Sequence, residues 1–208
     1  RCRQSAEILF PGEKQTVVVT KGNLEHRYVG STEEVLLPEA DEPLLSLKKR
    51  LEKDGCRKPH LLVSPMLRCR QSAEILFPGE KQTVVEDFRE CDFGTFEYKN
   101  YEELNGKADY QRFLDSMGEV PFPGGESKKE FSKRCSSAFE GELRKLMSEE
   151  AEVVFVVHGG TIMAVLDRFS EPHRDYYDWQ IGNAEGLRAE VTEEVGSGRI
   201  RLKEIRRI

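Results

Sequence analysis

Residues 152–161 read EVVFVVHGGT, and this stretch decides the fold. Residues 152–157 are the most strand-like run in the chain, because valine and phenylalanine fit a pleated, buried surface. Gly159 and Gly160 follow His158 and open a helix that we expect to continue to Phe169. A buried strand that leads directly into a helix is typical of α/β proteins.

The same alternation of strand and helix runs through most of the chain. The apolar spacing predicts strands over 60–64 and 82–85 and helices over 66–77 and 126–148. It also predicts a helix that starts near Asp41 as its N-cap and ends before Gly55, and two short helices within 99–116. The turn Gly196-Ser197-Gly198 separates two further strand-like runs, 187–193 and 199–205, and predicts a hairpin. We therefore expect a single-domain, three-layer α/β/α protein with a mainly parallel central sheet and an antiparallel C-terminal edge.

Composition excludes several classes of protein. The net charge of -6 disfavours a nucleic-acid partner, because phosphate backbones select clustered Lys and Arg. No apolar run approaches the roughly 18 residues of a membrane span, and we expect neither a membrane segment nor a signal peptide. The five cysteines form no Cys-x-x-Cys pair, so we expect no metal and reduced thiols in the cytoplasm.

An exact internal repeat interrupts this pattern. Residues 1–18 and 68–85 both read RCRQSAEILFPGEKQTVV. Diverged structural repeats do not stay identical over such a length, and a solenoid needs several copies. We interpret 1–18 as a foreign or artefactual N-terminus and 19–208 as the folded domain; a functional second copy is the alternative.

Three positions have the chemistry of a phosphate site. His158 ends a strand where the backbone N–H groups of the next helix favour an anion. Arg68 lies in the first helical turn after SPM (64–66), where a guanidinium can bind phosphate through two parallel hydrogen bonds. Glu90 lies in the turn FRECDFG (88–94) and would be a general acid if burial raises its pKa above about 4.3. A core histidine, a solvated arginine and an ordinary turn are the structural alternatives.

Together with PGGES (123–127), these motifs resemble the histidine phosphatase superfamily, and most of all its small alpha-ribazole-phosphatase-like members. The resemblance runs from Val19 to the end of the chain. It implies that Arg68 and His158 bind phosphate, that Gly159 lines the same site and that Glu90 donates a proton. In the loop 20–30 it implies substrate contacts by Thr20, Asn23 and Arg27. It implies no cofactor and no metal.

One part of the family pattern is missing. The family carries Arg-His-Gly, one residue and then Thr, which places the triplet at positions 16–18, where this chain has Thr-Val-Val. The nucleophilic histidine would therefore be replaced by Val17. We expect a phosphomonoesterase that acts on a small phosphorylated metabolite through a phosphohistidine, inactive or impaired as written. A catalytically dead protein that binds phosphorylated ligands is one alternative, and a phosphoglycerate mutase is another.

The geometry implied by this assignment is specific. Arg68, Glu90, His158 and Asn23 should converge at the carboxyl ends of the central strands. We expect residues 15–20 to form the first strand, with Val17 facing the pocket. We expect residues 1–10 to pack loosely outside the domain, since the helix that they copy already occupies its place at 68–77.

Overall fold

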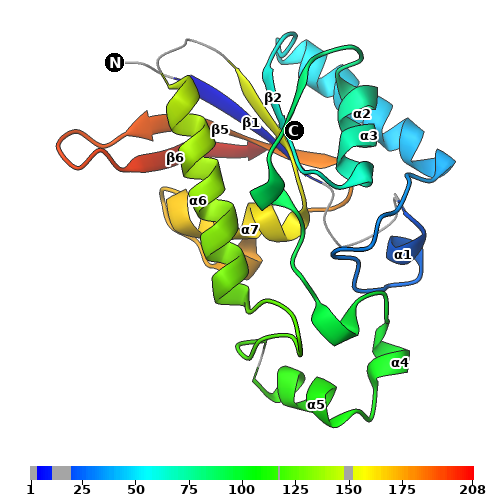
Figure 1. Ribbon diagram of the computed structural model, residues 1–208. Helices are drawn as coiled ribbons and strands as arrows, with labels where there is room; N and C mark the ends of the chain where they lie inside the picture. The colour runs from blue at the N-terminus through cyan, green and yellow to red at the C-terminus, as the bar shows by residue number, and fades with distance from the viewer. Residues whose placement is uncertain (1–3, 11–19, 117, 148–151) are drawn as a thin grey trace.

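The central sheet has six strands in the order β3-β2-β4-β1-β5-β6 (Figure 1). The computed structural model describes residues 4–10, 20–116, 118–147 and 152–208. The parallel part comprises β3 (Gln82–Val84), β2 (His60–Val63), β4 (Val153–Val156) and β1 (Gln4–Phe10). β5 (Glu185–Glu193) and β6 (Ile200–Arg207) add antiparallel pairs at one edge. The predicted fold class is confirmed.

Helices cover both faces of the sheet, and β4 shows why. Val153 and Phe155 belong to an apolar cluster with helices α6 (Lys128–Leu146) and α7 (Gly159–Phe169). Val154 and Val156, which point the opposite way, belong to a second cluster with α2 (Asp41–Lys53) and α3 (Leu67–Leu76). Alternate residues of a strand face opposite sides of a sheet, so a strand of buried apolar residues needs a helical layer on each side.

Local signals fix where the long helices begin. A capping box starts α6, in which Ser127 accepts from the Glu130 N–H and Glu130 accepts from the Ser127 N–H. The predicted N-cap of α2, Asp41, is instead its first residue. The 3-10 turn Pro38–Ala40 precedes it, and Ala40 is the cap residue. Pro43 lies in the first turn of α2 and is compatible with a helix that starts at Asp41 or one residue later. A proline lacks the backbone N–H, and in the first turn that N–H would have no helical partner.

The segment between β3 and α6 leaves the sheet, and its short helices lie at the bottom of Figure 1. Its buried side chains form a third apolar cluster, together with residues of α6 and α7. The segment holds the 3-10 turns Glu86–Phe88 and Gly94–Phe96 and the short helices α4 (Tyr101–Leu104) and α5 (Ala108–Asp115). The two short helices predicted within 99–116 are therefore confirmed. A further short helix, α1 (Lys21–Leu24), and the turn Tyr176–Trp179 lie in loops that follow β1 and α7.

The place of the first strand differs from the prediction. β1 is residues 4–10, which pair with β4 on one side and β5 on the other. The expectation that residues 1–10 pack outside the domain is wrong for 4–10. Without a strand between them, β4 and β5 would each have an unpaired edge, and residues 4–10 pair with both. Thr20 precedes α1 as its N-cap rather than ending a strand. The rest of the segment 15–19, Val17 included, lies outside the described residues.

Candidate active site

His158 lies where β4 passes into α7, as the sequence predicts. It is the N-cap residue of α7, and only 2% of it is exposed. Its Nε2 lies 2.7 Å from the Ser64 hydroxyl, and both ring nitrogens lie within 3.7 Å of the Cys69 sulfur. Burial, together with the positive charges of Arg68 and Arg134, holds the pKa of His158 well below 6.5. The imidazole is therefore neutral near pH 7 and presents one N–H donor.

Arg68 reaches the same edge of the sheet from the neighbouring strand. β2 and β4 run parallel, and the Ser64 N–H donates to the Val156 carbonyl, so α3 and α7 start side by side. The Arg68 side chain is buried and donates to the carbonyls of Val29, Gly30 and Thr32, each at 3.2 Å. These bonds fix the guanidinium inside a loop of backbone oxygens next to His158.

Glu90 completes the group. Its Oε2 lies 4.0 Å from His158 Nδ1, and its side chain is 15% exposed. Its Oε1 accepts from the Cys91 N–H at 2.9 Å. A methyl group added at Gly160 would lie 2.8 Å from Glu90 Oε1, so this glycine lets the carboxyl group approach the start of α7. Three of the predicted residues therefore meet: His158, Arg68 and Glu90.

The turn that carries Glu90 is held by Arg134, which sequence reasoning missed. Arg134 donates from Nε and Nη2 to the two oxygens of Glu126, at 2.9 and 2.6 Å. It also donates to the carbonyls of Asp87, Arg89 and Glu90. The available signal was weak: Arg134 stands beside Cys135 on the inward face of α6, where an arginine needs a buried acceptor.

The motif PGG (123–125) shapes the same turn from the other side. The Thr95 N–H donates to the Pro123 carbonyl, and the Glu126 N–H donates to the Asp92 carbonyl. A Cβ at Gly125 would lie 2.2 Å from the Asp92 oxygen, so only glycine permits this contact. Gly94 has φ +52, which favours glycine, and a Cβ at this position would lie 2.3 Å from the Pro123 carbonyl oxygen.

The predicted substrate residues Thr20 and Asn23 lie together on α1. Thr20 is fully buried, its hydroxyl caps the helix and it bonds Asn23 Oδ1 at 2.9 Å. Gly22 packs against Val29 and Glu34, which links α1 to the loop around Arg68. No hydrogen bond joins Asn23 to His158, Arg68 or Glu90 within the described part of the chain, so its role at the site stays a prediction.

Arg27 is engaged elsewhere. Its guanidinium forms ion pairs with Glu25 and Glu103, each at 2.5 Å, and lies 5.1 Å from the Tyr98 ring centroid. It also donates to the Tyr98 carbonyl. Two carboxylates already neutralise this cation, and the contacts favour a role in joining the loop 20–34 to the segment 97–103.

A second carboxylate, Glu97, also orders that loop and was not anticipated. Its Oε1 accepts from the N–H groups of Gly30 and Thr32 and from the Thr32 hydroxyl, at 2.7 to 3.0 Å. Glu97 therefore accepts hydrogen bonds from N–H groups of the segment 29–32, and carbonyls of the same segment accept from Arg68. Nothing in the spacing of the sequence joins positions 30, 68 and 97.

The remaining histidines of the chain lie elsewhere. His60 starts β2, opposite Val153, about 16 Å along the sheet from His158 at roughly 3.3 Å per residue. His26 is exposed after α1, and His173 lies 3.6 Å from Asp175 at the surface. The chain has four histidines in all, so His158 has no described histidine in position to share a phosphoryl group with it.

A cavity of about 260 Å³ opens beside Glu90 and Gly160. Its lining is mainly aromatic and comes from three parts of the chain: the loop at Tyr28, the segment 90–122, and the region 128–177 that includes α6, α7 and the turn at Tyr176. Burial and the nearby charge of Glu90 raise the pKa of the Tyr176 phenol. The cavity adjoins Glu90, the candidate acid.

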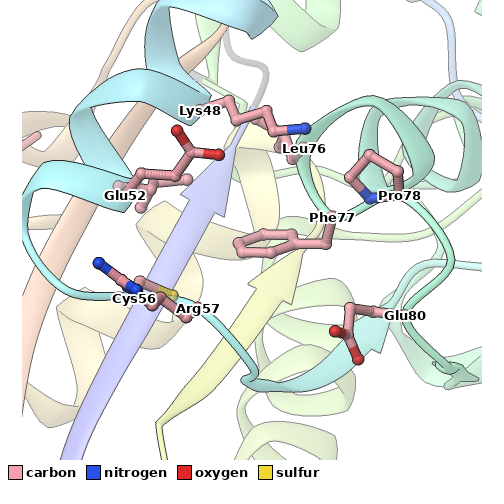
Figure 2. A pocket seen from close by; sticks show the side chains of 9 residues that line it. Lys48, Glu52, Cys56, Arg57, Leu76, Phe77, Pro78 and Glu80 are labelled. Carbon is pink, nitrogen blue, oxygen red and sulfur yellow. The ribbon is translucent and has the colours of Figure 1, made fainter.

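A larger cavity, of about 430 Å³, lies between α2 and α3, away from these residues (Figure 2). Phe77 forms its floor, while Lys48, Glu52, Arg57 and Glu80 stand around it. None of its lining residues contacts His158 or Glu90 in the described structure. Asp167, in the last turn of α7, and the exposed His173 and Asp175 after it bring possible metal-ligand atoms within 4.8 Å of one another. Neither feature belongs to the candidate site.

No helix among the described residues has the length and apolar character needed to span a membrane. No curated protein sequence matches the chain.

Several solved structures share the fold. An alpha-ribazole phosphatase from Shigella flexneri is 16% identical, with a TM-score of 0.75 over 96% of this chain and 95% of that one. Phosphoserine phosphatase from Entamoeba histolytica, a mutant in complex with phosphoserine, is 22% identical, with a TM-score of 0.74 over 97% and 96%. Phosphoglycerate mutase from Thermus thermophilus is 25% identical, with a TM-score of 0.64 over 97% and 98%.

The family model of the histidine phosphatase superfamily (branch 1) matches residues 18–200. This match covers the loop 20–34, the start of α3, the turn that carries Glu90 and the start of α7. The resemblance drawn from the motifs is confirmed at the level of the superfamily, and by family the chain is a phosphoric monoester hydrolase. The chain belongs to the histidine phosphatase superfamily, branch 1.

Proposed function

We propose that this domain is a phosphomonoesterase that works through a phosphohistidine, and that the chain as written is impaired because Val17 stands where the nucleophile belongs. The observation that supports it most strongly is the meeting of His158, Arg68 and Glu90 at the carboxyl ends of β2 and β4. Ligands of open α/β sheets bind at this edge. The substrate would be a small phosphorylated metabolite.

Each group has a distinct part in the reaction that the family implies. A neutral histidine nitrogen attacks phosphorus, and the P–O bond to the alcohol breaks. Glu90 gives its proton to the departing alkoxide. Arg68 and the N–H of neutral His158 stabilise the charge on the phosphoryl oxygens. Water then attacks phosphorus and releases phosphate from the histidine.

His158 itself is poorly suited to be the nucleophile. It is almost fully buried, and its Nε2 is occupied by the Ser64 hydroxyl. Its place at the N-terminus of α7 suits hydrogen-bond donation to a bound anion. The loss of a nucleophile costs on the order of 10⁶ in rate when knockouts of proteases are taken as a guide.

A phospho-ligand-binding protein without catalysis is the second candidate. The observation that favours it is that His158, Arg68 and Glu90 lie together in a chain without a described second histidine beside them. This candidate predicts binding of phosphate esters with no turnover.

Turnover of p-nitrophenyl phosphate tests the proposal. We expect almost none from the chain as it is. Replacement of residues 1–18 by a short apolar strand that ends in Arg-His-Gly should restore turnover without added metal. In the restored protein His158→Ala and Arg68→Ala should each reduce turnover strongly.

Two outcomes contradict the proposal. A rate typical of competent enzymes from the unaltered chain would show that Val17 does not occupy the nucleophile position. A restored protein that folds and binds phosphate but stays inactive, with or without divalent ions, would favour the binding protein.

A further inference from the structure

The cavity beside Glu90 is lined mainly by aromatic side chains. Tyr28, Phe93 and Phe122 pack edge to face, with ring centroids 5.0 to 6.0 Å apart. Phe113 adds a ring 4.5 Å from Phe122. Phe131 and Met163 continue the wall toward α7. Such a surface stabilises a bound ring by apolar burial and by edge-to-face contact.

Three of the polar side chains in the lining already have partners within the protein. Lys128 forms an ion pair with Glu119 at 2.6 Å and lies 5.4 Å from the Tyr177 ring centroid. The Tyr176 hydroxyl donates to the Gly160 carbonyl. Glu90 faces His158 and accepts from the Cys91 N–H. A hydroxyl-rich alcohol would exchange its hydrogen bonds with water for an apolar wall, which costs free energy for each unpaired group.

The position of the cavity ties it to the reaction rather than to a separate ligand. Glu90 and Gly160 are both lining residues, and Glu90 lies 4.0 Å from His158. A phosphoryl group held by His158 and Arg68 would therefore place its ester oxygen toward Glu90 and its alcohol in the cavity. The volume of about 260 Å³ suits one or two fused rings and is small beside the usual range of roughly 300–1,000 Å³ for ligand pockets.

We propose that the site selects phosphate monoesters of aromatic or similarly flat apolar alcohols over esters of polyols and amino acids. This inference rests on the proposed function, because it takes the phosphate position from His158 and Arg68. It adds a substrate class that the family and the fold leave open. The selecting side chains are those of Phe113 and Phe122, together with Tyr176 and Tyr177 of the turn Tyr176–Trp179.

Calorimetric binding to the chain as it exists tests the proposal. The probes are 2-naphthyl phosphate, glycerol 2-phosphate, inorganic phosphate and 2-naphthol. Because the burial of apolar surface contributes about 25 cal/mol per Å², we expect the naphthyl ester to bind at least about tenfold more tightly than the glycerol ester. Equal affinity for the two esters would overturn the proposal.

Two variants and a matched control locate the effect. Tyr177→Ala removes a ring that is 55% exposed, so the fold should survive, and Phe113→Ala removes a more enclosed ring. Both should reduce the preference for the naphthyl ester severalfold. Tyr101→Ala removes a ring that is 60% exposed on α4 and does not line the cavity, and it should leave the preference unchanged. A preference that survives in both cavity variants would place the ring elsewhere.

The neutral and the inorganic probes separate the two proposals. If neither phosphate nor any ester binds, the proposed phosphate site is wrong. Binding of 2-naphthol then tests separately whether the cavity is an aromatic site. Naphthol binding that Tyr177→Ala weakens and Tyr101→Ala does not would support an aromatic site. No binding of naphthol in that case would overturn it.

Discussion

Arg134→Met tests whether the Arg134–Glu126 pair holds the turn of the candidate acid. Methionine keeps the apolar stem of the side chain and removes the guanidinium. The change would delete two bonds to Glu126 and those to the carbonyls of Asp87, Arg89 and Glu90. Glu126 would keep its bond from the Asp92 N–H but lose its counter-charge.

The magnitude follows from the burial of the pair. The Arg134 and Glu126 side chains are 14% and 23% exposed. Removal of one partner of a fully buried pair costs about 3–5 kcal/mol, whereas an exposed pair contributes about 0–1 kcal/mol. We expect the loss of this intermediate pair to lower the free energy of unfolding by about 2–3 kcal/mol at pH 7.

The pH dependence has a definite sign. Burial acts to raise the pKa of Glu126, but the hydrogen bonds from Arg134 and the Asp92 N–H outweigh it and hold the pKa below 4.5. A depressed pKa in the folded state stabilises the protein above the unfolded value, and this contribution is lost as the pH falls through the folded value. The difference between the parent and the variant should therefore shrink below about pH 4.5.

Urea unfolding at pH 7 and near pH 3.5, followed by circular dichroism, measures both effects. Arg144→Met is the matched control, since Arg144 lies on the same helix and pairs with Glu140 and Glu193 but is 42% exposed. It should destabilise the protein much less. Equal losses in the two variants, or a loss at Arg134 that does not change with pH, would refute this account of the turn.

Three further outcomes follow from the structure. Gly125→Ala should destabilise the fold by more than about 1 kcal/mol, because its Cβ would lie 2.2 Å from a carbonyl oxygen; Gly141→Ala, in an open helical position, should stabilise it by about 0.5–1 kcal/mol, and urea midpoints compare them. Ser64→Ala should cost about 1–3 kcal/mol in thermal unfolding, since it leaves buried His158 Nε2 without its hydroxyl partner. Deletion of residues 1–10 should abolish cooperative unfolding, because it removes the strand between β4 and β5; a deleted protein that unfolds cooperatively would show that β1 is dispensable.

The spacing of apolar residues and the positions of turn residues were enough to predict most of the fold. The run 152–157 is apolar at nearly every position, as a strand covered on both faces must be, and it became β4. The apolar face of 126–148 predicted a long helix, which is α6 at Lys128–Leu146. Such signals act over a few residues, and a single sequence shows them directly.

The candidate site was predictable only in part, because only some of its residues carry a local sequence signal. His158, Arg68 and Glu90 each carry a local motif at the end of a strand, so topology alone brings them to one edge. The residues that orient them carry no such mark. Arg134 acts through the carbonyls of residues that stand more than forty positions earlier, and Glu97 acts through the N–H groups of Gly30 and Thr32. A backbone group has no signature in the sequence, and a contact made to it cannot be read from the spacing of side chains.

The repeated segment shows where local reasoning ends. QSAEILF is a strand at 4–10, whereas the same residues at 71–77 form the greater part of α3 and its C-cap. Ser72, Ala73 and Leu76 are buried at helical spacing against α2 and the sheet, after a turn that begins at the end of β2. The copy at 4–10 instead has β4 and β5 on its two sides, and each offers a row of backbone hydrogen bonds. Propensity differences of a few tenths of a kcal/mol per residue are small beside the bonds and buried area at stake in either place. We expected residues 1–10 to lie outside the domain, because the helix that they copy already occupies its place at 68–77. That reasoning failed for 4–10 because the strand position between β4 and β5 outweighs the helical preference of seven residues.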